Sequence, residues 1–210
     1  MSTLVLNPET LSERDTKLTL IPSAKSLSEL RVLAMPEGGI DRLSFMVWDT
    51  IEVLGFGVDT VELQGHYIIE RANPTAPDWA AASVDIRMLE MSVKGFSQKF
   101  GPVRASVNDA IGRPSQGQVK AGTIYPGVAD SPKLCEMNGY MKFELAAVPI
   151  TVFNKEPIVL QHRITHIPPI GQGGGTLGEV SINLYPIDDP DGSPVAVLRQ
   201  VKTHIGGWLS

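Results

Sequence analysis

The chain has 210 residues, of which 42% are hydrophobic and 20% are charged, and its formal net charge is -5. These proportions are typical of a packed globular protein and exclude a disordered or fibrous chain. The acidic balance provides no basic surface that could release counterions from a phosphate backbone, so we expect no nucleic-acid partner.

The N-terminal region carries a helix signal but no targeting signal. Ser26 and Glu29 have the spacing of a capping box, and Leu27 and Leu30 lie on one face of the helix that would follow. We therefore expect one short helix within an N-terminal extension, residues 1–40. The first residues lack the basic segment and apolar core of a secretory signal, and no run of about eighteen apolar residues follows, so we expect a soluble, cytoplasmic protein without membrane contact.

Alternation between apolar and polar residues predicts several strands with one buried face. The longest example covers residues 59–71, and shorter ones cover residues 138–145 and 178–187. In the first, the apolar face consists of Val61, Leu63, Gly65, Tyr67 and Ile69. If the segment 178–187 lay at the edge of a sheet, a second copy of the chain could pair with it, so self-association is expected.

The strand predicted over residues 83–93 changes the phase of its alternation once. Apolar residues occupy even positions up to Met88 and odd positions from Leu89 onward. Because one extra residue turns all later side chains to the other face, we expect a β-bulge or bend near Met88 and Leu89. A strand that crosses between two sheets, or one buried on both faces, would give the same pattern.

The segment from Asp109 to Glu136 is rich in glycine and proline and shows no sustained alternation. Long structureless loops are uncommon in compact domains, so we interpret this segment as an excursion within one domain. A functional loop, a short edge strand near residues 119–124 and a linker are the forms it could take. It contains Cys135, the only cysteine, with no histidine or positive pair beside it, and we expect a buried, inert thiol.

His162 and His166 could share a metal ion if their segment were a helix, because they would then lie one turn apart. The β-branched residues around them favour a strand instead. Along a strand the two residues are separated by about 13 Å, which is too far for both imidazoles to bind one ion. No HExxH motif or Cys/His cluster accompanies them, so we expect no structural metal.

Residues 173–178 read GGGTLG, which satisfies the G-x-G-x-x-G spacing of dinucleotide-binding loops. In those loops a strand precedes the glycines, and a helix whose N-terminus faces the pyrophosphate follows them. Here a predicted strand follows the glycines, and no acidic residue stands where a ribose would be bound. We therefore expect a mobile connection between antiparallel strands, and no nicotinamide or flavin cofactor.

The residues Asp188, Asp189, Pro190, Asp191 and Gly192 are typical of a type I turn. They predict a hairpin between the strand at residues 178–187 and the apolar run that follows the turn. The three carboxylates could also hold calcium, but an EF-hand spreads its ligands over about twelve residues and ends on a glutamate. Turn formation is the preferred explanation, and a calcium site is the alternative.

No catalytic motif is present in recognisable form. The sequence lacks G-x-S-x-G, a cysteine beside a histidine, and S-x-x-K in the required context. Paired carboxylates of the glycosidase kind would meet only in space. Trp48, Trp79 and Trp208 could line a ligand pocket, but tryptophan in a β protein more often lies in the core or at its rim. We therefore assign no catalytic, cofactor-binding or metal-binding residue.

Together these features predict a mainly β, antiparallel, single-domain protein. The expected architecture is a β-sandwich, and a partly closed β-barrel is the alternative. The missing motifs favour a non-catalytic binding or assembly module that contacts a protein partner or a second copy of itself through residues 112–127 and 171–178. The alternative is a hydrolase-like enzyme or a small-ligand carrier whose site is assembled from residues distant in sequence.

Overall fold

The computed structural model describes residues 35–108, 112–126 and 131–209. The chain divides into two units, Met1–Leu33 and Ala34–Ser210, and the described residues belong to the second. The short helix expected near Ser26 lies outside the described residues. Within them, no helix is long and apolar enough to cross a membrane.

Twelve strands make up the described fold, and every pairing between them is antiparallel. They are β1 (Gly39–Val53), β2 (Gly57–Arg71), β3 (Val84–Ser97), β4 (Gly101–Val107), β5 (Gln116–Val119), β6 (Lys133–Gly139), β7 (Met141–Leu145), β8 (Ile150–Asn154), β9 (Ile158–Ile164), β10 (Gly173–Gly175), β11 (Ile182–Pro186) and β12 (Ala196–Trp208). The predicted mainly β, antiparallel class is confirmed.

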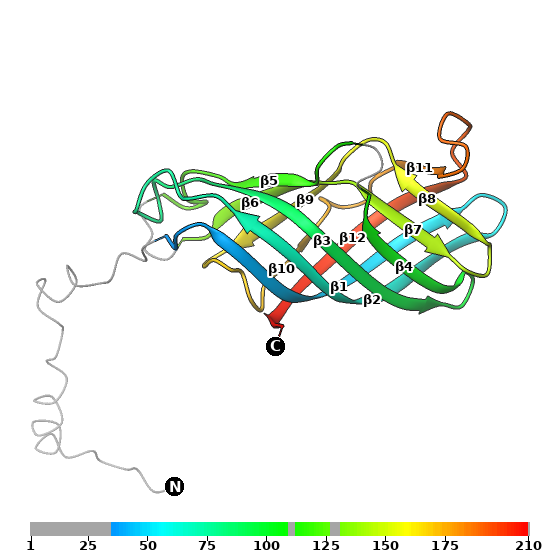
Figure 1. Ribbon diagram of the computed structural model, residues 1–210, viewed down its shortest axis with the longest axis horizontal. Coiled ribbons are helices and arrows are strands. Elements are labelled where there is room, and N and C mark those ends of the chain that lie inside the picture. The colour runs from blue at the N-terminus through cyan, green and yellow to red at the C-terminus, as the bar shows by residue number, and fades with distance from the viewer. Residues whose placement is uncertain (1–34, 109–111, 127–130, 210) are drawn as a thin grey trace, which may run out of the picture. The chain divides into compact units, whose positions relative to one another are not determined.

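The strands form one sheet whose pairings return on themselves. The long strands β12, β1, β2 and β3 lie side by side in this order, as Figure 1 shows. The shorter strands complete the ring in two sets, β4-β7-β8-β11 and β5-β6-β9-β10, and each set pairs with β3 at one side and β12 at the other. Two walls thus face each other across one core, as in the expected sandwich, yet they belong to a single hydrogen-bonded sheet.

The change of phase in β3 is a β-bulge, as predicted. Ile68 of β2 pairs with Glu90 and Ile69 pairs with Met88, so Leu89 has no partner in the register. Met88 is buried, whereas Leu89 is 39% exposed. At this point β3 also exchanges β5 for β4 as its neighbour. The extra residue therefore lets one strand present an inward face to both sets of short strands.

The hairpin predicted around the acidic turn is confirmed. β11 pairs with the first residues of β12, and the Gly192 N–H donates to the Asp189 carbonyl across the turn, at 3.2 Å. However, β11 also pairs with β8 on its other side. It is therefore an internal strand. The segment 178–187 has no unpaired edge in β11 with which a second copy of the chain could pair.

The segment 109–136 contributes to the ring more than its composition suggested. β5 pairs with both β3 and β6, so it is not an edge strand. Lys133, at the start of β6, is fully buried and connects the nearby loops. Its ammonium donates to the carbonyls of Trp79, at 2.7 Å, and Gly122, at 3.1 Å. Burial lowers the pKa of Lys133. The carbonyl oxygens provide the hydrogen-bond acceptors that its buried ammonium requires.

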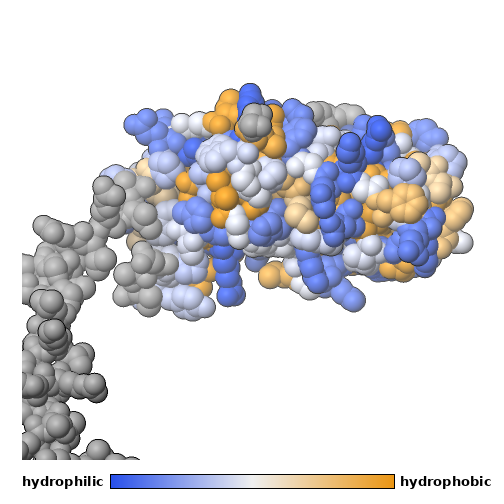
Figure 2. All heavy atoms as spheres, turned by 90° about the horizontal axis from the view of Figure 1, so that it is seen from below, coloured by the Kyte–Doolittle hydropathy of each residue, from blue (hydrophilic) through white to orange (hydrophobic). Residues whose placement is uncertain are grey.

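The core fills the inside of the ring, because alternate residues of each strand point inward. On β1 the buried apolar side chains are Leu43, Phe45, Val47, Ile51 and Val53. The outer surface is mixed in character, as Figure 2 shows for one face. Exposed apolar residues occur in the turn between β1 and β2, at Leu54 and Phe56, and at Val58 near the start of β2.

Candidate functional site

An apolar hollow of about 70 Å³ lies inside the ring, toward the end at which β1 begins and β2 ends. Its walls come from β1, β2, β3, β5, β6, β9 and β12, so strands far apart in the sequence build it together. A second hollow of about 20 Å³ lies farther along β1. Phe45, Met88 and Leu160 border both hollows. These three side chains therefore separate the two spaces. Met88 is flexible and Leu160 is aliphatic, so both can move.

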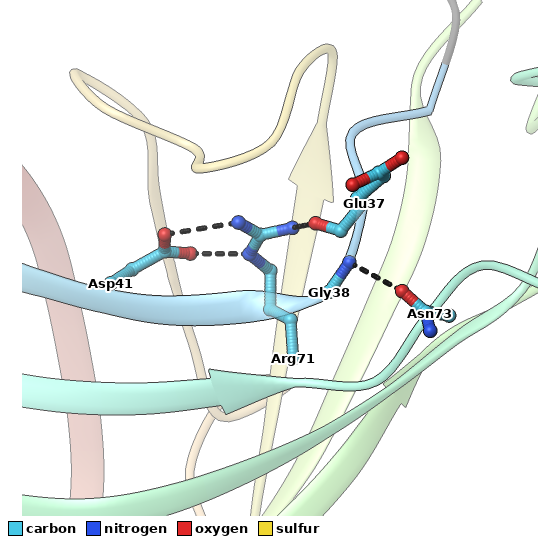
Figure 3. Close-up of polar contacts among 5 residues, drawn as sticks. All are labelled: Glu37, Gly38, Asp41, Arg71 and Asn73. Carbon is cyan, nitrogen blue, oxygen red and sulfur yellow. Dashed lines mark hydrogen bonds and ion pairs between the residues drawn. The ribbon is translucent and has the colours of Figure 1, made fainter.

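A buried ion pair lies at the border of the larger hollow. The Asp41 carboxylate accepts hydrogen bonds from Arg71 Nε at 2.6 Å and from its Nη2 at 3.2 Å. Arg71 Nη1 donates to the Glu37 carbonyl, at 2.7 Å, and the Gly38 N–H donates to Asn73 Oδ1, at 2.9 Å (Figure 3). Only 5% of the Asp41 side chain and 11% of the Arg71 side chain are exposed. The pair thus attaches the segment before β1 to the end of β2.

Asp49 places a carboxyl group inside the ring beside the smaller hollow. It occupies the inward phase of β1, between Val47 and Ile51, and is 3% exposed. Burial raises its pKa to about 7. Within the described residues, no side chain or backbone group forms a hydrogen bond or ion pair with this carboxyl. A carboxyl whose charged form is penalised by burial is a group that can exchange a proton near neutral pH.

A second interior polar group is the pair His162 and Thr203. His162 of β9 is buried, and its Nε2 lies 2.8 Å from Thr203 Oγ1 of β12. Burial lowers the pKa of His162 to about 4, so the imidazole is neutral at ordinary pH. His162 borders the larger hollow and Thr203 the smaller one. The pair therefore connects the two spaces through one hydrogen bond.

The glycine segment makes this arrangement possible. Gly173–Gly175 is the strand β10, which pairs with both β9 and β12. A Cβ at Gly174 would meet His162 Cδ2 at 2.3 Å and the Gln161 carbonyl oxygen at 2.5 Å, so no other residue fits without a shift. The prediction of a mobile connection is wrong for these three residues. Backbone pairing on both sides holds them, and the missing side chains allow close approach to the histidine.

Two other ionisable groups face the larger hollow and are kept neutral there. Burial raises the pKa of Cys135 to about 12, which agrees with the predicted buried, inert thiol. Burial also raises the pKa of Tyr67, and the Tyr67 ring packs against Phe45 with ring centroids 4.7 Å apart. The hollow therefore combines apolar walls with uncharged polar groups, apart from the ion pair at its border.

The structure separates the two histidines that the sequence offered as a pair. β9 ends at Ile164, so His166 lies beyond the strand. It is exposed, and its Nδ1 and Nε2 lie 2.7 Å from Gln172 Nε2 and 3.2 Å from the Ile170 carbonyl oxygen. His162 is inside the ring and His166 is outside it. Within the described residues, no cluster of three or more His, Cys, Asp or Glu residues could hold a metal ion.

The acidic turn and the tryptophans line neither of the two hollows. Asp189 closes the turn through its carbonyl, and Asp191 is an almost fully exposed residue whose carboxylate lies 3.6 Å from Lys155 Nζ. Trp79 is buried and donates to the Ser131 carbonyl, at 3.2 Å. The other two tryptophans lie elsewhere: Trp48 donates to Glu62 on the outer face, and Trp208 is exposed.

Sequence reasoning did not single out Asp49 or Thr203. The signal for Asp49 was present, because the alternating apolar positions of residues 43–53 include one carboxylate. A charged residue in the buried phase of a strand is unusual unless it is paired or functional. The signal for Thr203 was weaker, because threonine is common in strands.

The chain is similar to one solved structure, DynF from the dynemicin biosynthesis pathway of Micromonospora chersina. It is 32% identical, with 84% of each chain covered and a TM-score of 0.78. No curated protein matches the chain. A family model described as a family of unknown function, DUF6073, matches residues 7–210. The likeness to a biosynthesis protein overturns the expectation of a non-catalytic binding or assembly module, and it favours the alternative, an enzyme or small-ligand carrier.

Proposed function

We propose that this chain, which belongs to the DUF6073 family, binds a small apolar molecule inside its ring of strands and serves a biosynthetic pathway. The observation that carries this proposal is the pair of adjoining hollows, whose walls are almost entirely apolar. Apolar walls with a few placed polar groups are the usual composition of a small-molecule site. The likeness to DynF supports a role in biosynthesis.

The walls also indicate how a larger molecule would be accommodated. The larger hollow already exceeds by several times the roughly 10–15 Å³ that a water-sized group requires. Met88, Met91, Met137 and Met141 all border the hollows. Methionine is unbranched and flexible, so its side chain adjusts to irregular ligands. Displacement of these side chains would join the two spaces into one narrow, elongated site.

Access to the site would run past the loop that follows β9. Ile167 and Pro169 of this loop border the larger hollow, and both are only half-buried. The ion pair of Asp41 and Arg71 also borders this hollow. Elsewhere the hydrogen-bonded strands enclose the space. A molecule that entered here would be removed from water along most of its length.

The test is a titration of the purified protein with hexane, followed by NMR of the methionine methyl groups. We expect the methyl signals of the interior methionines to shift in a saturable manner. Leu160→Trp would fill the space between the hollows and should weaken hexane binding by at least about tenfold. Val159→Trp is the matched control, because Val159 is the neighbouring residue on β9 and faces outward. Unchanged methyl signals at saturating hexane, or equal loss in both variants, would contradict the proposal.

A further inference from the structure

Within the proposed apolar site, the unpartnered carboxyl of Asp49 has no structural role that the described residues explain. It forms no ion pair and no hydrogen bond there, and it lies beside empty space. We propose that Asp49 is the ligand-binding group of this site, where its neutral carboxyl donates a hydrogen bond to the carbonyl oxygen of an otherwise apolar ligand. This inference rests on the proposed function, because the ligand must first enter the ring.

The surroundings of Asp49 explain why the neutral form is the relevant one. The side chains that face it come from β3, β4, β7, β9 and β12, and they are apolar except for Thr203. None of these facing residues is ionisable. Thr203 in turn contacts His162, whose imidazole is neutral. Burial without a compensating cation raises the pKa of Asp49 to about 7, so the protonated carboxyl is well populated at and below neutral pH.

The chemistry of a neutral carboxyl selects the partner. Its O–H is a strong donor, and a buried donor without an acceptor is costly. Thr203 forms a hydrogen bond with His162, at 2.8 Å, and none with Asp49. A carbonyl oxygen satisfies the donor without bringing a charge into the apolar interior. An ammonium ligand would require the carboxylate form instead, which the burial disfavours.

A hydrogen bond from a carboxylic acid would also polarise the bound carbonyl. A donor fixed in a dry site stabilises negative charge that develops on a carbonyl oxygen during reaction. The apolar part of the ligand would extend from Asp49 toward the larger hollow, past Phe45 and Leu160. The proposal therefore assigns both the orientation of the ligand and the class of functional group that is recognised.

The experiment compares 2-hexanone with hexane, both measured by NMR titration, at about pH 5.5 and about pH 9. The proteins are the wild type, Asp49→Leu, which has no donor, and Asp49→Asn, whose amide donates at every pH. Asp188→Asn, at an exposed turn position, is the matched control. Methyl spectra of each variant without ligand verify that it is folded.

We expect wild type at the lower pH to bind 2-hexanone at least about tenfold more tightly than Asp49→Leu does. Above neutral pH the wild-type affinity should fall by up to about tenfold per pH unit toward that of Asp49→Leu, because only the protonated fraction donates the hydrogen bond. Asp49→Asn should bind the ketone with no such dependence on pH. Hexane should bind the wild type and Asp49→Leu equally well.

Several results would overturn the inference. If hexane binds but replacement of Asp49 by leucine leaves ketone affinity unchanged, the carbonyl assignment is wrong, while the proposed function stands. The same holds if Asp49→Asn retains the wild-type pH dependence, or if hexylammonium binds the wild type more tightly than 2-hexanone. If neither hexane nor 2-hexanone binds any variant, the proposed function fails as well.

Discussion

Replacement of Asp49 by asparagine should stabilise the folded protein at and above neutral pH. The wild-type carboxyl has an ordinary pKa of 3.8 in the unfolded chain and a pKa of about 7 in the folded state. Between these values the unfolded chain releases the proton and the folded protein retains it, so the free energy of unfolding decreases as the pH rises. Each pH unit in this interval costs about 1.4 kcal/mol. The total penalty, complete above about pH 7, is about 4 kcal/mol.

Asparagine has nearly the same shape and no titrating group, so the variant escapes this penalty. The difference in unfolding free energy between Asp49→Asn and wild type should increase by about 4 kcal/mol from about pH 4 to about pH 7, and then remain constant. Urea unfolding at pH intervals of about one unit measures this difference. Asp188→Asn is the control, because an exposed carboxyl carries no burial penalty. A difference that does not vary with pH would refute the assignment of Asp49 as a carboxyl forced to remain neutral.

Three further predictions concern the groups around the site. His162 has a pKa of about 4 in the folded state against 6.5 unfolded, so its contribution to stability is lost as the pH falls through this interval. Urea unfolding of His162→Gln should therefore show a gain relative to wild type of about 3 kcal/mol between about pH 6.5 and pH 4. Gly174→Ala should destabilise the fold by about 1–3 kcal/mol through the clash with His162, whereas Gly207→Ala, with open space around it, should change stability by less than about 0.5 kcal/mol in thermal unfolding. Arg71→Met should cost about 3–5 kcal/mol because Asp41 remains buried and unpaired, and the double variant with Asp41→Leu should recover most of the loss in the same assay.

The pH terms of Asp49 and His162 have opposite signs. Between about pH 4 and pH 6.5 the contribution of Asp49 falls as that of His162 rises, so the two slopes cancel in the wild type. Either single replacement would expose the slope of the other group. Parallel pH profiles for wild type and both variants would contradict this compensation.

Much of the strand content could be predicted from the sequence, because it depends on local alternation. The strand expected at residues 59–71 is β2, and the phase change near Met88 is a bulge. In contrast, β10 consists only of glycine, so it has no side-chain pattern to detect. Closure of the ring depends on the pairing of β1 with β12, which joins residues far apart in the sequence. No local signal encodes that contact.

The site was harder to predict than the strands for a related reason. The sequence showed the apolar phase of residues 43–53, but it did not show that the opposite wall would leave space beside Asp49. The sequence predicted one strand that carries both His162 and His166, yet β9 ends at Ile164. Its actual partner, Thr203, lies on another strand. Each of these features depends on which strands become neighbours.

The pairing of β1 with β12 also determines the order in which the protein can be completed. β12 is the last strand of the described chain, so the ring cannot close until residues 196–208 have left the ribosome. Pairings of such high sequence separation form slowly. Asp49 lies opposite Val201 in this final pairing. Val201 and Thr203 line the hollow beside Asp49, so the wall around its carboxyl is complete only when the last strand docks.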